Sequence, residues 1–199
     1  MFKGISAYIA DLLVKNETIT ENEHDIYSFG IQQGINILIN LITILFFGIL
    51  LGEIWQSLVF TIAYIPLRSY AGGFHAKTPT RCYVFSCCLI AAVLLAIKYL
   101  LIEDFIYSSL LAAGGIIIIL LAPVDTLNKR LDQVEVRVYR NRTLIIVAME
   151  TVVYVLSIIF TAEMIYKPIS LSIVSAAFML TLGVIDNQRQ MKHCNKKCK

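Results

Sequence analysis

Charged residues are scarce in this chain. Of its 199 residues, 16% are Asp, Glu, Lys or Arg, whereas 58% are hydrophobic and the mean hydropathy is +0.74. A soluble domain is roughly a quarter charged, and a chain of this length cannot hide so many apolar side chains in one soluble core. The composition argues against a soluble enzyme, a disordered protein and a nucleic-acid-binding protein. It predicts an integral membrane protein that forms a single domain over residues 1–199.

A disulfide framework is also missing. The chain has five cysteines, an odd number that cannot pair fully within the chain, and they follow no repeating spacing. Cys87 and Cys88 lie within an apolar run, where a free cysteine behaves as a small hydrophobic residue. The N-terminal segment has spaced rather than continuous apolar residues and no small-residue cleavage site, so we do not expect a cleavable signal peptide.

Long apolar runs dominate what is present. A bilayer core about 30 Å thick needs roughly 20 apolar residues per helix. Six segments are candidates, the second of them short and able to continue into Tyr70. We therefore predict an all-α integral membrane protein whose residues 30–185 form a six-helix membrane bundle. The predicted spans are residues 30–51, 54–66, 83–102, 105–124, 143–162 and 169–185.

Residues 1–29 precede this bundle. Apolar residues at near-helical spacing predict an N-terminal amphipathic helix that lies on the membrane or on the bundle. An acidic loop follows, with a helix start expected near Thr20. The apolar positions are Phe2, Ile5, Ile9, Leu12 and Leu13.

Lys and Arg alternate across the predicted spans. From the N-terminal segment to the tail, the segments outside the spans carry 2, 0, 3, 0, 5, 1 and 5 of them. Cytoplasmic loops are enriched in Lys and Arg, so both termini and the loop after the second span are predicted on the cytoplasmic side. The basic tail, residues 186–199, is expected to be solvated, although His193, Cys194 and Cys198 could bind a metal there.

The stretch RSYAGGFHAKTPTRCY, residues 68–83, is a polar loop with two glycines between two apolar spans. It places His75 and Cys82 seven residues apart, which on one straight helix is about 10.5 Å and too far for a hydrogen bond. Thr78 followed by Pro79 is typical of a helix start, as is Thr80 as a cap. Either start puts Cys82 in the first turn of a helix, and His75 can fold back onto it.

This arrangement suits nucleophilic catalysis. A neighbouring imidazole can take the proton of a thiol, and the positive end of a helix dipole favours the thiolate. Gly72 and Gly73 permit close approach of a substrate, and N–H groups at the helix start could stabilise an oxyanion. A single His and a single Cys in a loop are, however, usually incidental. Two local ligands are too few for tetrahedral zinc, so we predict no metal and no cofactor.

The pattern RxxxGGxHxxxxxxC, formed by Arg68, Gly72, Gly73, His75 and Cys82 ahead of an apolar helix, resembles the accessory gene regulator B family. Members are membrane-embedded cysteine endopeptidases of Gram-positive bacteria that process quorum-sensing pro-peptides. The likeness covers most of the chain. It extends to the chain length, the amphipathic N-terminus, the six spans, and a stretch holding Pro123, Asn128, Lys129 and Arg130.

The resemblance implies a cysteine endopeptidase in the cell membrane, with its active site on the cytoplasmic side. Cys82 would attack the carbonyl ahead of the pro-peptide's C-terminal tail, with His75 as base. A Cys or Ser of the peptide would then displace the resulting thioester and close a thiolactone or lactone ring. The resemblance also suggests a homodimer.

The family's pro-peptides carry an amphipathic N-terminal helix and an acidic C-terminal tail. Basic residues of the loops would suit that tail, although the positive-inside rule and anionic lipid explain basic loops equally well. The candidate substrate-binding or supporting residues are Arg68, Gly72, Gly73, Lys77, Lys129 and Arg130.

Two other classes of protein stay open. A small membrane transporter or export component for a peptide or ion would line a path with polar residues, for which Asn36, Asn40, Thr43 and Glu150 are candidates. A membrane scaffold or sensor would carry the His–Cys loop by accident. Glu150 is a functional candidate because it lies inside a span. It also lies close enough to the helix start to reach water or a basic loop as a structural partner.

Overall fold

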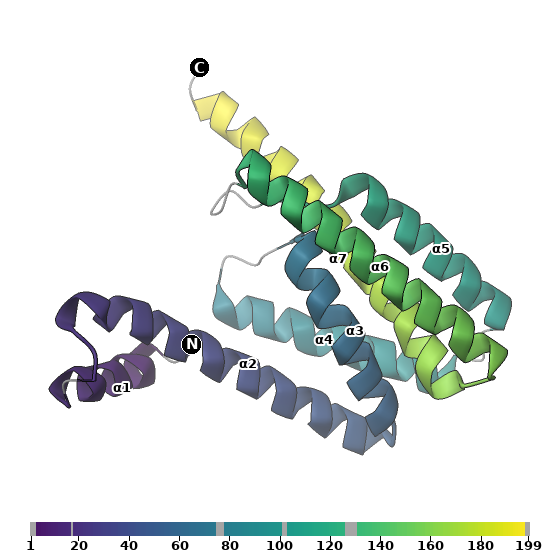
Figure 1. Cartoon of the computed structure of the whole chain (residues 1–199), viewed down its shortest axis with the longest axis horizontal. Coiled ribbons are helices and arrows are strands. Elements are labelled where there is room, and N and C mark those ends of the chain that lie inside the picture. The colour runs from purple at the N-terminus through teal and green to yellow at the C-terminus, as the bar shows by residue number, and fades with distance from the viewer. Residues whose placement is uncertain (1–2, 17, 75–77, 101–102, 126–130, 198–199) are drawn as a thin grey trace.

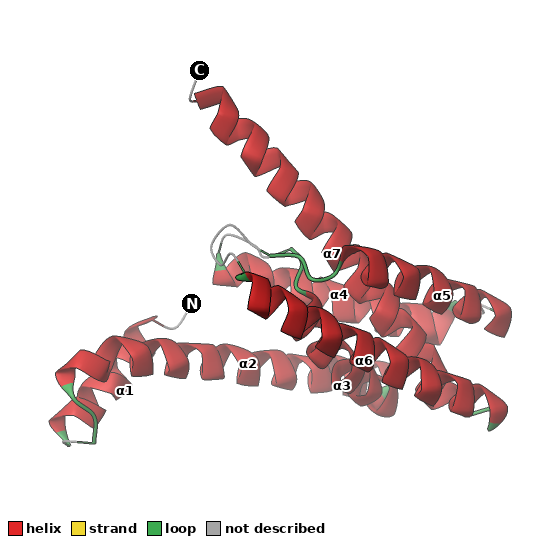
Figure 2. Ribbon diagram, turned by 45° about the horizontal axis from the view of Figure 1, so that its top comes forward, coloured by secondary structure: helices red, strands yellow, loops and turns green. Residues whose placement is uncertain are grey.

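The computed structural model describes residues 3–16, 18–74, 78–100, 103–125 and 131–197 (Figure 1). These ranges contain helices and no strand (Figure 2), so the all-α prediction is confirmed. The elements are α1 (Lys3–Lys15), a short 3-10 helix η1 (Glu21–Glu23), α2 (His24–Leu51), α3 (Ile54–Ala71), α4 (Pro79–Tyr99), α5 (Asp104–Leu121), α6 (Gln133–Ile159) and α7 (Glu163–Lys197).

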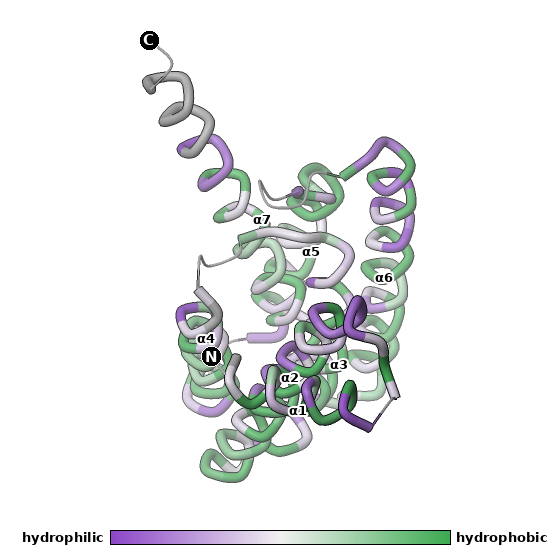
Figure 3. The backbone as a smooth tube through the Cα atoms, turned by 90° about the vertical axis from the view of Figure 1, so that its left-hand side faces the viewer, coloured by the Kyte–Doolittle hydropathy of each residue, from purple (hydrophilic) through white to green (hydrophobic). Residues whose placement is uncertain are grey.

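Large apolar side chains cover the outside of the helices. Ile62, Phe105 and Leu120 are each more than 70% exposed, and contiguous apolar surface of this kind marks contact with a membrane or a partner. Figure 3 shows the hydrophobic residues along the helices and hydrophilic residues at the N-terminal end of α6. Among the described residues, the helices over 21–51, 80–99, 104–121, 133–159 and 163–189 are long and apolar enough to cross a membrane. The prediction of an integral membrane protein is therefore confirmed.

The predicted second span forms α3, which is not among those five helices. Its 18 residues include Gln56, Pro66 and Arg68, which lower its hydropathy. It packs against α2, α6 and α7. Five spans therefore meet the length and hydropathy of a membrane helix, and the six-span count is not confirmed.

Several helices extend beyond the apolar runs that predicted them. α6 begins at Gln133 rather than at residue 143, because a capping box closes its first turn. In that box the Asp132 carboxylate accepts from the Glu135 N–H, and the Glu135 carboxylate accepts from the Asp132 N–H at 3.2 Å. The Asp132 carboxylate also accepts from the Gln133 N–H at 2.7 Å. α7 likewise begins before residue 169 and continues as a helix where the sequence predicted a tail. Hydropathy alone misses such polar helix ends.

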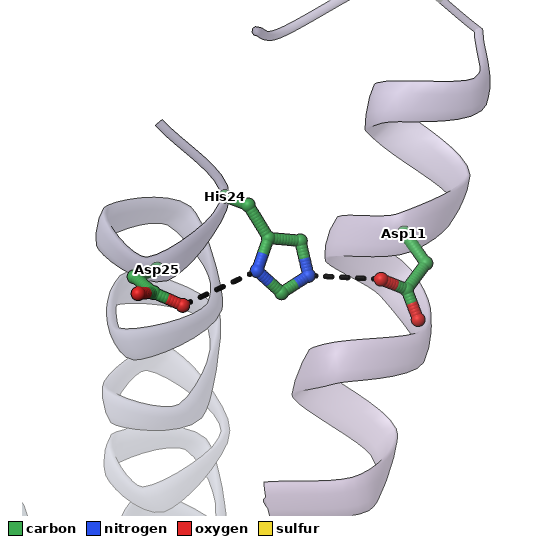
Figure 4. A network of polar contacts seen from close by, with 3 residues as sticks. All are labelled: Asp11, His24 and Asp25. Carbon is green, nitrogen blue, oxygen red and sulfur yellow. Dashed lines mark hydrogen bonds and ion pairs between the residues drawn. The ribbon is translucent and has the colours of Figure 1, made fainter. Parts of the chain in front are cut away.

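α1 and the N-terminal part of α2 form a helical hairpin that extends away from the other helices (Figure 1). α1 packs against α2, with Ser6 and Ala10 completely buried. His24 links the two helices, because its Nε2 lies 2.9 Å from Asp11 and its Nδ1 lies 3.3 Å from Asp25 (Figure 4). The expected helix start is also present, since Thr20 caps η1 in a capping box with Glu23.

Two apolar clusters hold the bundle together. One joins α3, α5, α6 and α7 around buried residues such as Leu67, Ile118 and Ile173. The other joins α2, α3 and α4 around Phe60 and Leu94. Tyr64 on α3 packs against both clusters. The C-terminal half of α3 therefore lies where the two clusters meet, next to the loop that carries the sequence motif.

Candidate active site

The two glycines of the motif turn the chain sharply after α3. Gly72 and Gly73 have φ angles of +78° and +115°, which residues other than glycine rarely adopt. A Cβ on Gly72 would lie 2.2 Å from the carbonyl oxygen of Val124, and one on Gly73 would lie 2.7 Å from that of Met179. Both conformation and space therefore require glycine at these positions.

Backbone hydrogen bonds tie this glycine loop, residues 72–74, to distant parts of the chain. The Phe74 N–H donates to the carbonyl of Met179 on α7 at 2.9 Å, and the Val124 N–H donates to the carbonyl of Ala71 at 3.0 Å. Gly72 and Val124 form an isolated parallel bridge. The loop is thus held against α7 on one side and against the segment after α5 on the other.

Arg68 closes the loop from within. Its guanidinium donates to the carbonyl oxygens of Gly72 and Phe74 through two different nitrogens. A planar guanidinium is suited to such two-pronged binding. These two contacts hold the backbone of the loop, and a role of Arg68 in substrate binding stays a prediction.

Cys82 lies in the first turn of α4, as the sequence predicted. Thr78 is the N-cap, Pro79 is the first helical residue, and the Thr78 hydroxyl accepts from the Arg81 N–H at 3.4 Å. The Cys82 N–H donates to the Thr78 carbonyl at 3.1 Å. Its thiol is free and half-buried. The first N–H groups of an α-helix have no partner within the helix, and that of Thr80, the second residue of α4, is one of them.

A pocket of about 180 Å³ brings these parts together. Helix α3, the glycine loop, α4 and α7 each contribute to its wall. In its wall, the ring centroids of Phe74 and Phe85 lie 6.1 Å apart, and the Ser86 hydroxyl donates to the Cys82 carbonyl at 3.0 Å. The lining residues are Tyr64, Arg68, Phe74, Cys82, Phe85, Ser86 and Met179.

Four of the predicted site residues, His75, Lys77, Lys129 and Arg130, lie outside the described residues. The structure therefore places Arg68, Gly72, Gly73 and Cys82 in one site and leaves the His–Cys contact as a prediction. The undescribed stretch 75–77 lies between Phe74, which lines the pocket, and Thr78, which caps α4.

Sequence reasoning missed several residues that shape the site. Tyr64, Phe85 and Met179 lie in apolar runs, where nothing separates a pocket wall from ordinary helix packing. Gly183 did carry a signal, because an isolated glycine inside a helical pattern often has a packing reason. A Cβ on Gly183 would lie 2.7 Å from the carbonyl carbon of Gly73.

Glu150 belongs to a different cavity, of about 400 Å³, between α3, α6 and α7. It is 8% exposed, and its Oε2 accepts from the Ser172 hydroxyl at 3.4 Å. Its Oε1 is buried without a partner in the described part of the chain. The expectation that Glu150 reaches water or a basic loop is therefore wrong, because helix packing surrounds it.

The other polar residues considered for a transport path are bonded locally. Asn40 donates to the Asn36 carbonyl at 2.8 Å, and the Thr43 hydroxyl lies 2.7 Å from that of Tyr83. These contacts lie within α2 and between α2 and α4. No group of three or more His, Cys, Asp or Glu side chains suited to a metal occurs in the ranges that the structure describes.

Comparison with known proteins agrees with the sequence motif. A model of the family described as accessory gene regulator B matches residues 6–180. This match covers α2 to α6, most of α1 and the pocket-forming part of α7. Searches of curated proteins and of solved structures gave no match.

Proposed function

Because the chain belongs to the accessory gene regulator B family, which is associated with pro-peptide processing in quorum sensing, we propose that it is a membrane-embedded cysteine endopeptidase. Cys82 is the nucleophile and His75 is the base. The observation that carries the proposal is the position of Cys82: a free thiol in the first turn of α4 lines a pocket whose wall includes Phe74. His75 follows Phe74 directly in the sequence.

The reaction begins with a proton transfer from the Cys82 thiol to His75. The thiolate attacks the carbonyl carbon of the scissile peptide bond, and the electron pair moves to the carbonyl oxygen. When this tetrahedral intermediate collapses, the C–N bond breaks and His75 returns the proton to the leaving amine. The C-terminal tail departs, and the signal segment stays on Cys82 as a thioester.

The start of α4 supports the charges that develop in this step. The positive end of the helix dipole lies at the first turn and favours the thiolate. The Thr80 N–H is a candidate donor to the carbonyl oxygen as it becomes an oxyanion. A Cys or Ser side chain of the peptide then attacks the thioester, which releases Cys82 and closes a thiolactone or lactone. Exclusion of water by the surrounding bilayer favours this exchange over hydrolysis.

The substrate in this proposal is a pro-peptide with an amphipathic N-terminal helix and an acidic C-terminal tail. Lys77, Lys129 and Arg130 are its candidate contacts for the tail. Both termini and the Cys82 pocket face the cytoplasm of a Gram-positive cell, as the alternation of Lys and Arg supports. The working unit is a homodimer.

The test is a cleavage assay in membranes of a host that lacks such a system. The chain is expressed with the short, acid-tailed peptide encoded beside its gene, and the peptide mass is measured. We expect wild type to release a C-terminal fragment and a product lighter by that tail. Cys82→Ser and His75→Ala, at equal membrane abundance, should leave the peptide intact. Equal cleavage by wild type and Cys82→Ser would refute the proposal in favour of a transporter or scaffold.

A further inference from the structure

We propose that the pocket beside Cys82 receives the side chain of the residue whose carbonyl Cys82 attacks, and that it selects a large apolar side chain there. The inference rests on the proposed function and adds the substrate residue that the site prefers. It assigns a specificity role to Phe74, Phe85 and Met179, three residues outside the sequence motif or unremarkable within it.

The placement of Cys82 in the pocket wall is the first reason. The attacked carbonyl carbon must approach the Cys82 sulfur, and the Cα that carries the substrate side chain is bonded to this carbon. A side chain at that position is therefore beside the pocket that Cys82 itself lines. Phe85 lies three residues after Cys82 and so projects from the same face of α4.

The chemistry of the wall is the second reason. The rings of Phe74 and Phe85 are tilted by 51° with their centroids 6.1 Å apart, Met179 is 5% exposed, and Tyr64 adds a further aromatic ring. A volume of about 180 Å³ has room for one large side chain. Burial of an apolar side chain against these rings and the Met179 thioether is favourable. An ionised side chain would lose its hydration there, and these groups form no strong hydrogen bonds to replace it.

The state of the polar wall atoms is the third reason. Arg68 lines the pocket, but its guanidinium donates to the carbonyls of Gly72 and Phe74. The Ser86 hydroxyl donates to the Cys82 carbonyl. An apolar substrate side chain leaves these bonds in place, whereas an acidic one would find only the N–H groups of Arg68 that the two carbonyls do not use.

The test uses tripeptide chloromethyl ketones that differ only in the last residue, which is Phe, Leu, Ala or Asp. The Cys82 thiolate displaces chloride from the chloromethyl carbon, a thioether forms, and the added mass on the Cys82 peptide is measured. The full-length chain is used in detergent micelles. Each rate is divided by the rate with iodoacetamide, which reports access to the thiol alone. Because a pocket discriminates roughly 10- to 200-fold per methylene group, we expect the Phe and Leu probes to react at least about tenfold faster than the Ala and Asp probes.

A pair of neighbouring substitutions shows whether the pocket causes the preference. Phe85→Trp fills the pocket and should reduce the ratio of the Phe rate to the Ala rate to near one. Val84→Trp adds the same ring to an exposed position, 53% accessible, and should leave the ratio unchanged. Equal rates for all four probes, a fastest Asp probe, or an unaltered ratio in Phe85→Trp would each overturn the inference.

The two proposals fail in distinguishable ways. If Cys82→Ser abolishes peptide cleavage while the probes react equally, the peptidase stands and the pocket assignment falls. If Cys82→Ser still cleaves the peptide, the proposed function falls, and the pocket assignment falls with it whatever the probe rates are.

Discussion

The backbone N–H of Phe74 donates to the carbonyl oxygen of Met179 at 2.9 Å, and this bond ties the residue before His75 to helix α7. One turn further along α7, Gly183 packs directly against Gly73. α7 is therefore more than a membrane helix, because its face at Met179 and Gly183 determines where the glycine loop lies. Substitutions on this face should act on catalysis without touching the motif.

Gly183→Ala should impair cleavage at least about tenfold. The new Cβ would meet the Gly73 backbone at 2.7 Å, so the loop or the helix must move. Overpacking of this kind costs about 1–3 kcal/mol, and a displaced loop would change the position of the proposed base, His75, relative to Cys82. Peptide cleavage at equal membrane abundance is the measurement. Gly115→Ala on α5 is the matched control, since nothing lies within 4 Å of its added Cβ, and it should cleave like wild type.

Arg68→Lys should lose most of the activity although the charge is kept. A lysine ammonium cannot reproduce the two-pronged contact with the Gly72 and Phe74 carbonyls. Hydrogen bonds from charged donors are worth about 1.5–3 kcal/mol each, so loss of one prong loosens the loop. We expect kcat to fall by about tenfold or more with little change in KM. Arg189→Lys, at an exposed position of α7, provides the control. A rise in KM that vanishes with a neutralised peptide tail would instead make Arg68 a tail-binding residue.

Much of this site could be predicted from local sequence, and the rest depends on contacts between distant segments. Thr78 and Pro79 mark the start of α4 because capping is a local property of the backbone. The pair Gly72 and Gly73 likewise indicates a turn with positive φ angles, because glycine adopts them readily. Nothing local connects Gly73 with Gly183 or Phe74 with Met179, since those contacts arise only when α3 and α7 pack. Hydropathy also ended the second span at residue 66 and assigned Arg68 to the polar loop, whereas α3 continues to Ala71 and carries Arg68 within the helix.

Asp11→Asn should loosen α1 from α2. The substitution removes the charge that faces His24 Nε2 at 2.9 Å, while the contact of Nδ1 with Asp25 remains. The pair is exposed, so the effect is small: we expect hydrogen exchange of the α1 amides to accelerate roughly two- to fivefold. Glu21→Gln removes one negative charge from an exposed residue of η1 and should leave exchange unchanged. Equal acceleration by both would show that net charge, rather than the Asp11–His24 contact, holds the hairpin.

Glu150→Gln should stabilise the protein and leave cleavage intact. The carboxylate is 8% exposed, and its Oε1 is buried without a partner among the described residues, so the ionised group is costly to keep inside the bundle. Gln keeps the size and cannot ionise, and a gain of about 1 kcal/mol would raise Tm by roughly 2–4 °C. Cleavage should persist because the Glu150 cavity shares no lining residue with the Cys82 pocket.

Thermal unfolding in detergent and peptide cleavage are measured together, with Glu103→Gln at an exposed position as the control. If Glu150→Gln abolished cleavage at unchanged Tm, the buried carboxylate would take part in the function itself. Coupling between the two cavities would then have to be sought through α3 and α7, which line both.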